Sequence, residues 1–128
     1  MSSEEKAGKI LIMEDEELVS TIAIQMLEFL GYDSALALDG ETAIEMYREN
    51  FESGTPFSIV IMDLSIPGGM GGEAAVKEVL KIDPGAKVIV SSGNSHDPAM
   101  VNFKDFGFSA AISKPFNVAD LTQVLQQL

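Results

Sequence analysis

The chain has 128 residues, 46% of them hydrophobic, so it is long enough for one domain with a single core. It contains no cysteine, which excludes disulfide bonds and thiolate metal sites. Its net charge of -12 argues against a nucleic-acid-binding surface, because phosphate backbones require clustered basic residues. No apolar run approaches the roughly 20 residues that cross a bilayer, and the polar N-terminal residues do not resemble a signal peptide. We therefore expect a cytoplasmic protein that binds neither nucleic acid nor membrane directly.

Five short apolar runs predict β-strands along the chain. These runs are Lys9–Met13, Tyr32–Leu38, Phe57–Met62, Ala86–Ser92 and Ala110–Ser113. Three of them are rich in isoleucine, valine and leucine without polar alternation, which is typical of strands buried on both faces of a parallel sheet. Residues 1–8 are expected to be a disordered leader, and residues 9–128 to form one domain.

Segments with helical periodicity lie between and after these runs. In chain order, the five segments run from Leu18 to Gly31, from Asp39 to Gly54, from Ala75 to Pro84, from Asp97 to Gly107 and from Asn117 to Leu128. In the short fourth segment, Asp97 fits an N-cap and Pro98 the first helical position. Regular alternation of strand and helix predicts an α/β fold, a three-layer sandwich with right-handed crossovers.

Polar residues stand at the carboxyl ends of four predicted strands. Glu14 and Asp15 follow the first strand, Asp63 follows the third, Ser92 ends the fourth, and Lys114 follows the fifth. Ligands of open parallel sheets bind outside these strand ends, so we expect the five side chains to meet at one edge. Each residue alone fits a helix cap or a solvated surface position, but their joint placement indicates a site.

Three carboxylates gathered in this way need compensating charge. Two like charges about 5 Å apart repel by roughly 3 kcal/mol at an effective dielectric of about 20. Lys114 offsets one negative charge, and a divalent cation would offset the other two. Ligands that are all oxygen suit Mg²⁺. A carboxylate beside Mg²⁺ and a lysine is also a nucleophile toward phosphorus, and positioned cations neutralise the oxygens of a transferring phosphoryl group.

Four motifs, ILIMEDEE, IVIMDLSIPGGMGGEA, VIVSSG and ISKPF, resemble in their order and spacing the receiver domain of response regulators. The resemblance covers the chain from about Lys9 to Leu128. It implies a flavodoxin-like (βα)5 fold with the parallel strand order 2-1-3-4-5. It also implies a phosphoacceptor switch of a two-component or phosphorelay system, supplied by a histidine kinase or a histidine phosphotransfer protein. Such a domain is a signalling switch, not an enzyme, although it promotes its own phosphorylation and dephosphorylation.

The resemblance also gives each polar residue a role. Asp63 matches the phosphoacceptor, Ser92 the switch hydroxyl and Lys114 the lysine of the family. The implied Mg²⁺ ligands are all oxygens, from Asp15, Asp63, the backbone carbonyl of Ser65 and, through water, Glu14. A cis peptide bond is expected at Lys114–Pro115, a geometry that X-Pro bonds allow at modest cost.

Two features depart from the family pattern. Ala111 stands three residues before the lysine, where these domains often carry a tyrosine or phenylalanine that moves inward on activation. The output is therefore expected to travel through backbone and helix shifts. The loop after Asp63 has one residue more than the commonest pattern and contains four glycines, as in receivers attached to hybrid sensor kinases. A homodimer through the region of the fourth and fifth helices is a further expectation.

Two other functions compete with this interpretation. A receiver-like interaction module would work without phosphorylation, but all five groups expected of a working site are present. A flavodoxin-like cofactor binder would have a loop rich in serine, threonine and glycine after the first strand, where this chain has residues 14–17, all acidic. His96, the only histidine, is expected in an exposed loop and not as a metal ligand.

Overall fold

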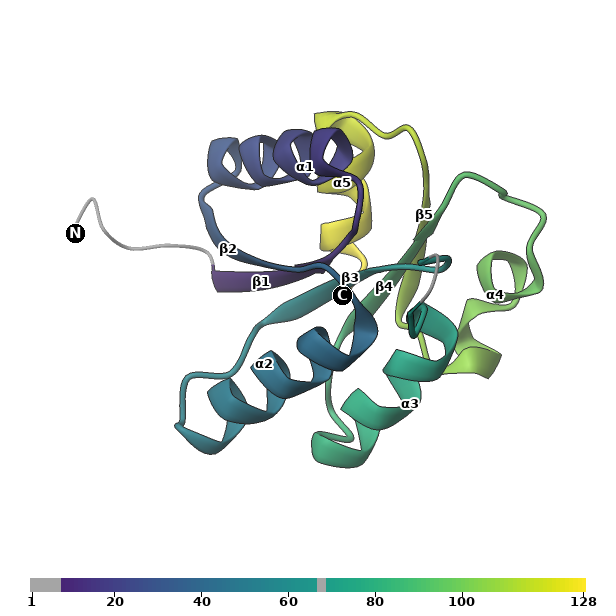
Figure 1. Cartoon of the computed structure of the whole chain (residues 1–128). Coiled ribbons are helices and arrows are strands. Elements are labelled where there is room, and N and C mark those ends of the chain that lie inside the picture. Colours follow the sequence, from purple (N-terminus) through teal and green to yellow (C-terminus); the bar gives the residue numbers. More distant parts are fainter. Residues whose placement is uncertain (1–7, 67–68) are drawn as a thin grey trace.

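Five parallel strands form one sheet in a computed structural model, which describes residues 8–66 and 69–128 (Figure 1). The strands are β1 (Gly8–Met13), β2 (Tyr32–Ala37), β3 (Ile59–Asp63), β4 (Val88–Ser92) and β5 (Ala110–Ser113). Their order across the sheet is β2-β1-β3-β4-β5, which confirms the predicted topology. The expected leader lies outside the described residues except for Gly8, with which β1 begins.

Helices cover both faces of this sheet. They are α1 (Glu17–Phe29), α2 (Gly40–Glu52), α3 (Gly72–Ile82), α4 (Pro98–Val101) and α5 (Val118–Gln126), with a 3-10 helix, η1 (Phe103–Phe106), after α4. Helices α1 and α5 lie on one face, and α2 and α3 lie on the other, so the fold has three layers (Figure 1). Across the described ranges, none of the helices combines the length and apolar character needed to span a bilayer.

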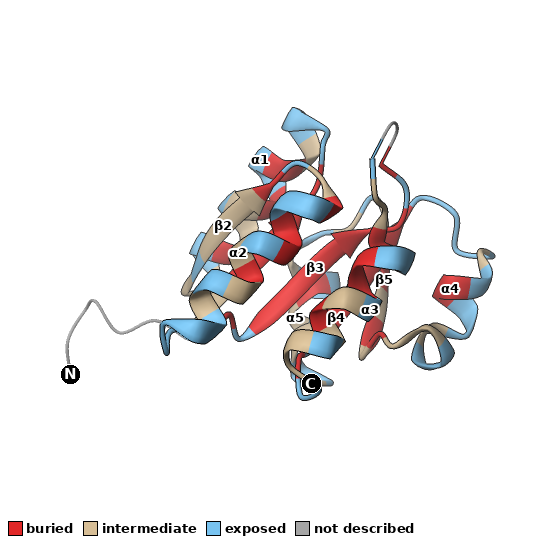
Figure 2. Ribbon diagram, turned by 60° about the horizontal axis from the view of Figure 1, so that its bottom comes forward, coloured by how far each residue is buried: buried red, intermediate tan, exposed pale blue. Residues whose placement is uncertain are grey.

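The sheet separates two hydrophobic clusters. Successive side chains of a strand point to opposite faces, so Ile10 and Ile12 of β1 pack toward α1 and α5, whereas Leu11 and Met13 pack toward α2 and α3. Strands β3 and β4 are buried along their whole length (Figure 2). The central strands therefore hold the carboxyl edge of the sheet on a rigid base.

Helix α1 buries less of its apolar surface than its sequence predicts. Ala23 and Leu27 face the sheet and are buried, but Leu18 and Ile22 are 72% and 42% exposed. A helix on a sheet buries only one stripe, and the apolar stripe of α1 is wider than the surface that the sheet and α5 cover. The two exposed side chains lie in the first half of the helix, beside the carboxyl edge of the sheet.

The segment between β4 and β5 forms two short helices where one was expected. Helix α4 begins as predicted, with the Asp97 side chain accepting from the Ala99 N–H at 3.0 Å, but it ends after one turn. Phe103 and Phe106 of η1 are partly buried against the cluster that also contains α2 and α3. Gly107 then ends η1 in the left-handed conformation, at a φ of 100°.

Candidate functional site

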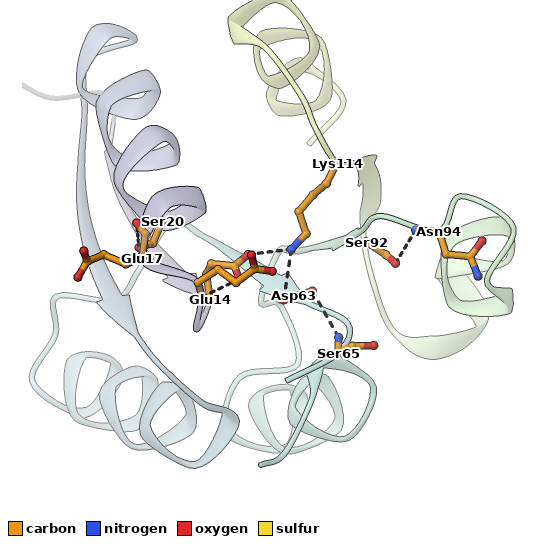
Figure 3. Close-up of polar contacts among 9 residues, drawn as sticks. Glu14, Glu17, Ser20, Asp63, Ser65, Ser92, Asn94 and Lys114 are labelled. Atoms are coloured by element: carbon orange, nitrogen blue, oxygen red, sulfur yellow. Dashed lines mark hydrogen bonds and ion pairs between the residues drawn. The ribbon is translucent and has the colours of Figure 1, made fainter. Parts of the chain in front are cut away.

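The structure brings the predicted polar residues together at the carboxyl edge of the sheet (Figure 3). Parallel pairing causes this arrangement, because Asp63 at the end of β3 is in register with Ser91 of β4. Glu14, Asp63 and Ser92 are 3%, 6% and 8% exposed, so the site is recessed. Asp15 is exposed at its rim.

Lys114 connects two of the carboxylates. Its Nζ atom lies 2.9 Å from Oε1 of Glu14 and 3.3 Å from Oδ2 of Asp63 (Figure 3). The expected cis peptide bond is present between Lys114 and Pro115. Sequence reasoning did not say which acid the lysine would meet, and the structure assigns Glu14 and Asp63 to it and leaves Asp15 at the rim.

The three acids form a group that fits a hard cation. Glu14, Asp15 and Asp63 each offer one carboxylate oxygen, and these oxygens all lie within 4.8 Å of one another. Three negative charges and the one positive charge of Lys114 leave two negative charges uncompensated. Oxygen donors with this residual charge suit Mg²⁺. Ser65 lies directly beside them, because its backbone N–H donates to Oδ1 of Asp63 at 3.4 Å.

Burial and ion pairing shift the pKa values of Glu14 and Lys114 in opposite directions. Burial raises the pKa of Glu14, and the hydrogen bond from Lys114 lowers it without cancelling that effect, while the charge of Asp63 raises it further. Burial lowers the pKa of Lys114, but its hydrogen bonds and charge interactions with Glu14 and Asp63 outweigh burial and raise it overall. The lysine therefore stays protonated, and Glu14 retains its proton to a higher pH than a free glutamate does.

The raised pKa of Glu14 makes the stability of the metal-free protein depend on pH. Above the ordinary pKa of 4.5, folded Glu14 binds more protons than unfolded Glu14, so the free energy of unfolding falls as the pH rises through this window. We expect Glu14→Gln to remove this component. Urea unfolding in EDTA from pH 4 to pH 8 should show the parent losing stability relative to the variant as the pH rises. Parallel curves for the two proteins would contradict this account.

The hydroxyl of Ser92 has a partner that sequence reasoning missed. Its Oγ atom accepts a hydrogen bond from the backbone N–H of Asn94 at 3.0 Å (Figure 3). A serine hydroxyl can accept this bond and still donate its own hydrogen. The contact therefore orients the oxygen and leaves its hydrogen available to an acceptor in the site. His96 lies in the exposed loop that follows, as predicted, and its backbone N–H donates to Oδ1 of Asn94.

A pocket of about 540 Å³ opens beside this site, between α1 and the connection from β5 to α5. Asp63, Ser65, Ser92 and Lys114 line its polar end. The apolar wall is formed by Val19, Ile22, Ala23, Met26, Pro115 and Phe116. Sequence reasoning used the apolar residues of α1 only as evidence for a helix and so missed this pocket. The unusually wide apolar stripe of α1 was the available signal.

The position of the usual aromatic residue lies on the other side of the sheet from this pocket. Ala111 of β5 is half-buried and packs against the hydrophobic cluster that contains α2, α3 and α4. A methyl group there cannot make the large inward movement of an aromatic ring. The expectation that output travels through backbone and helix shifts stays a prediction.

The sequence is similar to receiver domains, both by a family model and by comparison with curated proteins. The family model described as the response regulator receiver domain matches residues 10–126. The chemotaxis protein CheY of Thermotoga maritima is 31% identical over 121 residues, which are 94% of this chain and 96% of that protein. Some of the other curated relatives are longer, and the chain covers 47% of one and 20% of another.

Solved structures share the fold. The CheX–CheY complex with BeF3 and Mg²⁺ from Borrelia burgdorferi aligns with a TM-score of 0.83 at 24% identity, over 92% of this chain and 86% of that chain. The receiver domain of the sensor histidine kinase PA1611 from Pseudomonas aeruginosa aligns with a TM-score of 0.81 at 25% identity, over 94% and 95%. That receiver domain has a magnesium ion coordinated in its active-site cleft.

Proposed function

The chain belongs to the response regulator receiver domain family, and from this premise we propose that it accepts a phosphoryl group on Asp63 with Mg²⁺ bound alongside. The proposed ligands are Asp15, Asp63, the carbonyl of Ser65 and, through water, Glu14. The observation that supports this most directly is the placement of Asp63. Its carboxylate is buried, lies within 4.8 Å of two other acids and is 3.3 Å from the ammonium of Lys114.

Each residue has a defined task in the transfer. An oxygen of Asp63 forms a bond to phosphorus while the phosphorus–nitrogen bond of the donor phosphohistidine breaks, and the electron pair stays on the imidazole nitrogen. Lys114 donates to a phosphoryl oxygen, and Ser92 donates its free hydrogen to another. Glu14 holds Lys114 in place at 2.9 Å. Mg²⁺, when bound, supplies positive charge to the phosphoryl oxygens.

The partner that we propose is a histidine kinase or a histidine phosphotransfer protein. The pocket beside Asp63 and the exposed Leu18 of α1 support a protein donor, because exposed apolar surface next to a reactive group favours docking of another protein. We further propose a cytoplasmic location and a domain that spans residues 9–128. A homodimer through α4 and α5 stays a prediction, for which the exposed Val101 of α4 offers apolar surface.

A small phosphoryl donor tests the function without the cognate kinase. Incubation with acetyl phosphate and Mg²⁺ should add one phosphoryl group to each chain, and EDTA should prevent the addition. Intact-mass spectrometry, recorded soon after mixing, measures the product. Mg²⁺ should also stabilise the fold, by about 2.7 kcal/mol at a concentration 100 times its dissociation constant. A mass that stays unchanged under all conditions would contradict the proposal.

The competing hypothesis, a phosphorylation-independent interaction module, predicts the opposite results for phosphorylation by acetyl phosphate and for stabilisation by Mg²⁺. Such a module would incorporate no phosphoryl group and would gain no stability from Mg²⁺. The compact acid cluster argues against it, because three clustered carboxylates destabilise a fold that never binds a cation. A protein that gains stability from Mg²⁺ but is not phosphorylated by acetyl phosphate would show an intact metal site with an unreactive acceptor.

A further inference from the structure

The loop that follows Asp63 is attached to the N-terminus of α2. The backbone N–H of Gly40, the first residue of α2, donates to the carbonyl of Met70 at 3.1 Å. This N–H has no partner within the helix, and the carbonyl dipole suits the positive end of the helix. The approach is close, because a Cβ atom on Gly40 would lie 2.6 Å from the Met70 oxygen and 2.8 Å from its Cβ. Only glycine allows this contact without a shift of the loop.

The same loop then returns to the backbone of the acceptor. A Cβ atom on Gly71 would lie 2.5 Å from the carbonyl oxygen of Leu64, and one on Gly72 would lie 2.9 Å from that of Asp63. Gly71 and Gly72, which follow Met70, therefore pack directly against the backbone of residues 63–64, where the loop begins. The Leu64 N–H is fixed in turn to the carbonyl of Ser91 at 2.9 Å. A shift of Met70 therefore displaces Gly71 and Gly72, and through their close approach it bears on the acceptor segment, residues 63–65.

We propose that Gly40 is a positioning residue for the metal site. By lacking a side chain, it lets α2 hold Met70, and through Met70 the acceptor segment, in the position that metal binding requires. Helix α2 carries none of the proposed ligands, so Gly40 acts only through this contact. The inference rests on the proposed function, because it concerns the same Mg²⁺ site.

Gly40→Ala tests the proposal in the full chain. Its methyl group must push Met70 away, so we expect the dissociation constant for Mg²⁺, measured by calorimetry, to rise about tenfold, the smaller effect seen when groups that orient metal ligands are changed. The displacement of Met70 costs stability, but alanine is the better helix former and offsets part of this cost, so the urea midpoint in EDTA should fall only slightly. Gly85→Ala is the matched control: its Cβ would make only an ordinary contact, 3.5 Å from Oδ1 of Asp83, and Mg²⁺ affinity should not change.

Two results would overturn the inference. One is an unchanged Mg²⁺ affinity in Gly40→Ala, and the other is a loss of affinity that only matches a loss of folded protein in EDTA. A parent chain that binds no Mg²⁺ would refute the proposed function and this inference together, whereas a parent that binds and a variant that binds equally well refute the inference alone.

A measurement on the parent covers the case in which Gly40→Ala does not fold. In ¹⁵N-labelled protein, the amide resonance of Gly40 should move during a Mg²⁺ titration with the same dissociation constant as the site. The amide of Gly85, exposed in the connection between α3 and β4, should not move. A Gly40 amide that stays unchanged through saturation would show that the helix and the metal site are not connected in this way.

Discussion

Asp63→Asn should abolish phosphorylation by acetyl phosphate. The amide keeps the size of the carboxylate, but its oxygen is a poor nucleophile and carries no charge for a cation. We expect the rate of incorporation to fall at least about 10³-fold, which corresponds to about 4 kcal/mol of transition-state free energy. The measurement is the intact mass at a series of times with saturating Mg²⁺. Asp33→Asn, which changes an exposed aspartate of β2, is the control and should react like the parent.

The same variant should show two stability changes of opposite sign. Removing one of three like charges should raise the free energy of unfolding in EDTA, because Glu14 and Asp15 no longer repel a charged group at position 63. It should also reduce the stabilisation that Mg²⁺ provides, because one ligand charge is lost. This combination separates a chemical role from simple misfolding. If Asp63→Asn is labelled as strongly as the parent, the acceptor assignment is wrong.

Lys114→Met should slow phosphorylation about 10²-fold, the effect of removing one positioned donor from a reacting centre. Methionine keeps most of the apolar stem and removes the ammonium that lies 3.3 Å from Asp63. The free energy of unfolding in EDTA should also fall, because buried Glu14 loses its only cation partner among the described residues. Initial rates at saturating Mg²⁺ and urea unfolding measure the two effects.

Two further variants make the lysine experiment specific. Lys87→Met removes an exposed lysine before β4 and should change neither rate nor stability appreciably. Lys114→Arg keeps the positive charge but replaces a compact ammonium by a planar guanidinium. Compared with Lys114→Met, it should therefore restore the free energy of unfolding in EDTA more fully than the phosphorylation rate. A Lys114→Met protein that reacts as fast as the parent would remove the lysine from the proposed mechanism.

The fold was predictable because its signals are local. Alternating apolar runs and helical stripes identify the elements, and parallel strand pairing then sets where their carboxyl ends meet. The strand boundaries were less accurate for a physical reason. Phe57 and Ala86 are buried at 5% and 9% exposure, but β3 begins at Ile59 and β4 begins at Val88. Apolar side chains report burial, and burial extends beyond the hydrogen-bonded ladder.

The gathering of the polar residues at one sheet edge was predictable, but their individual contacts were not. Glu14 and Asp15 are adjacent acids, and only the backbone at the end of β1 decides that Glu14 turns inward to Lys114 while Asp15 stays exposed. The contact between Gly40 and Met70 joins a helix end to a loop, and neither periodicity nor a motif encodes it. Such contacts depend on the distances between finished elements and therefore require the structure.

The ion pair between Glu14 and Lys114 joins residues that are 100 positions apart in the chain. During synthesis, Asp63 leaves the ribosome well before Lys114, so the nascent chain does not yet have the ammonium that lies 3.3 Å from Asp63 in the folded protein. The site exists only once β5 has joined the sheet. Incomplete copies that lack β5 should therefore accept a phosphoryl group no faster than Lys114→Met does, so that transfer favours molecules that have finished folding.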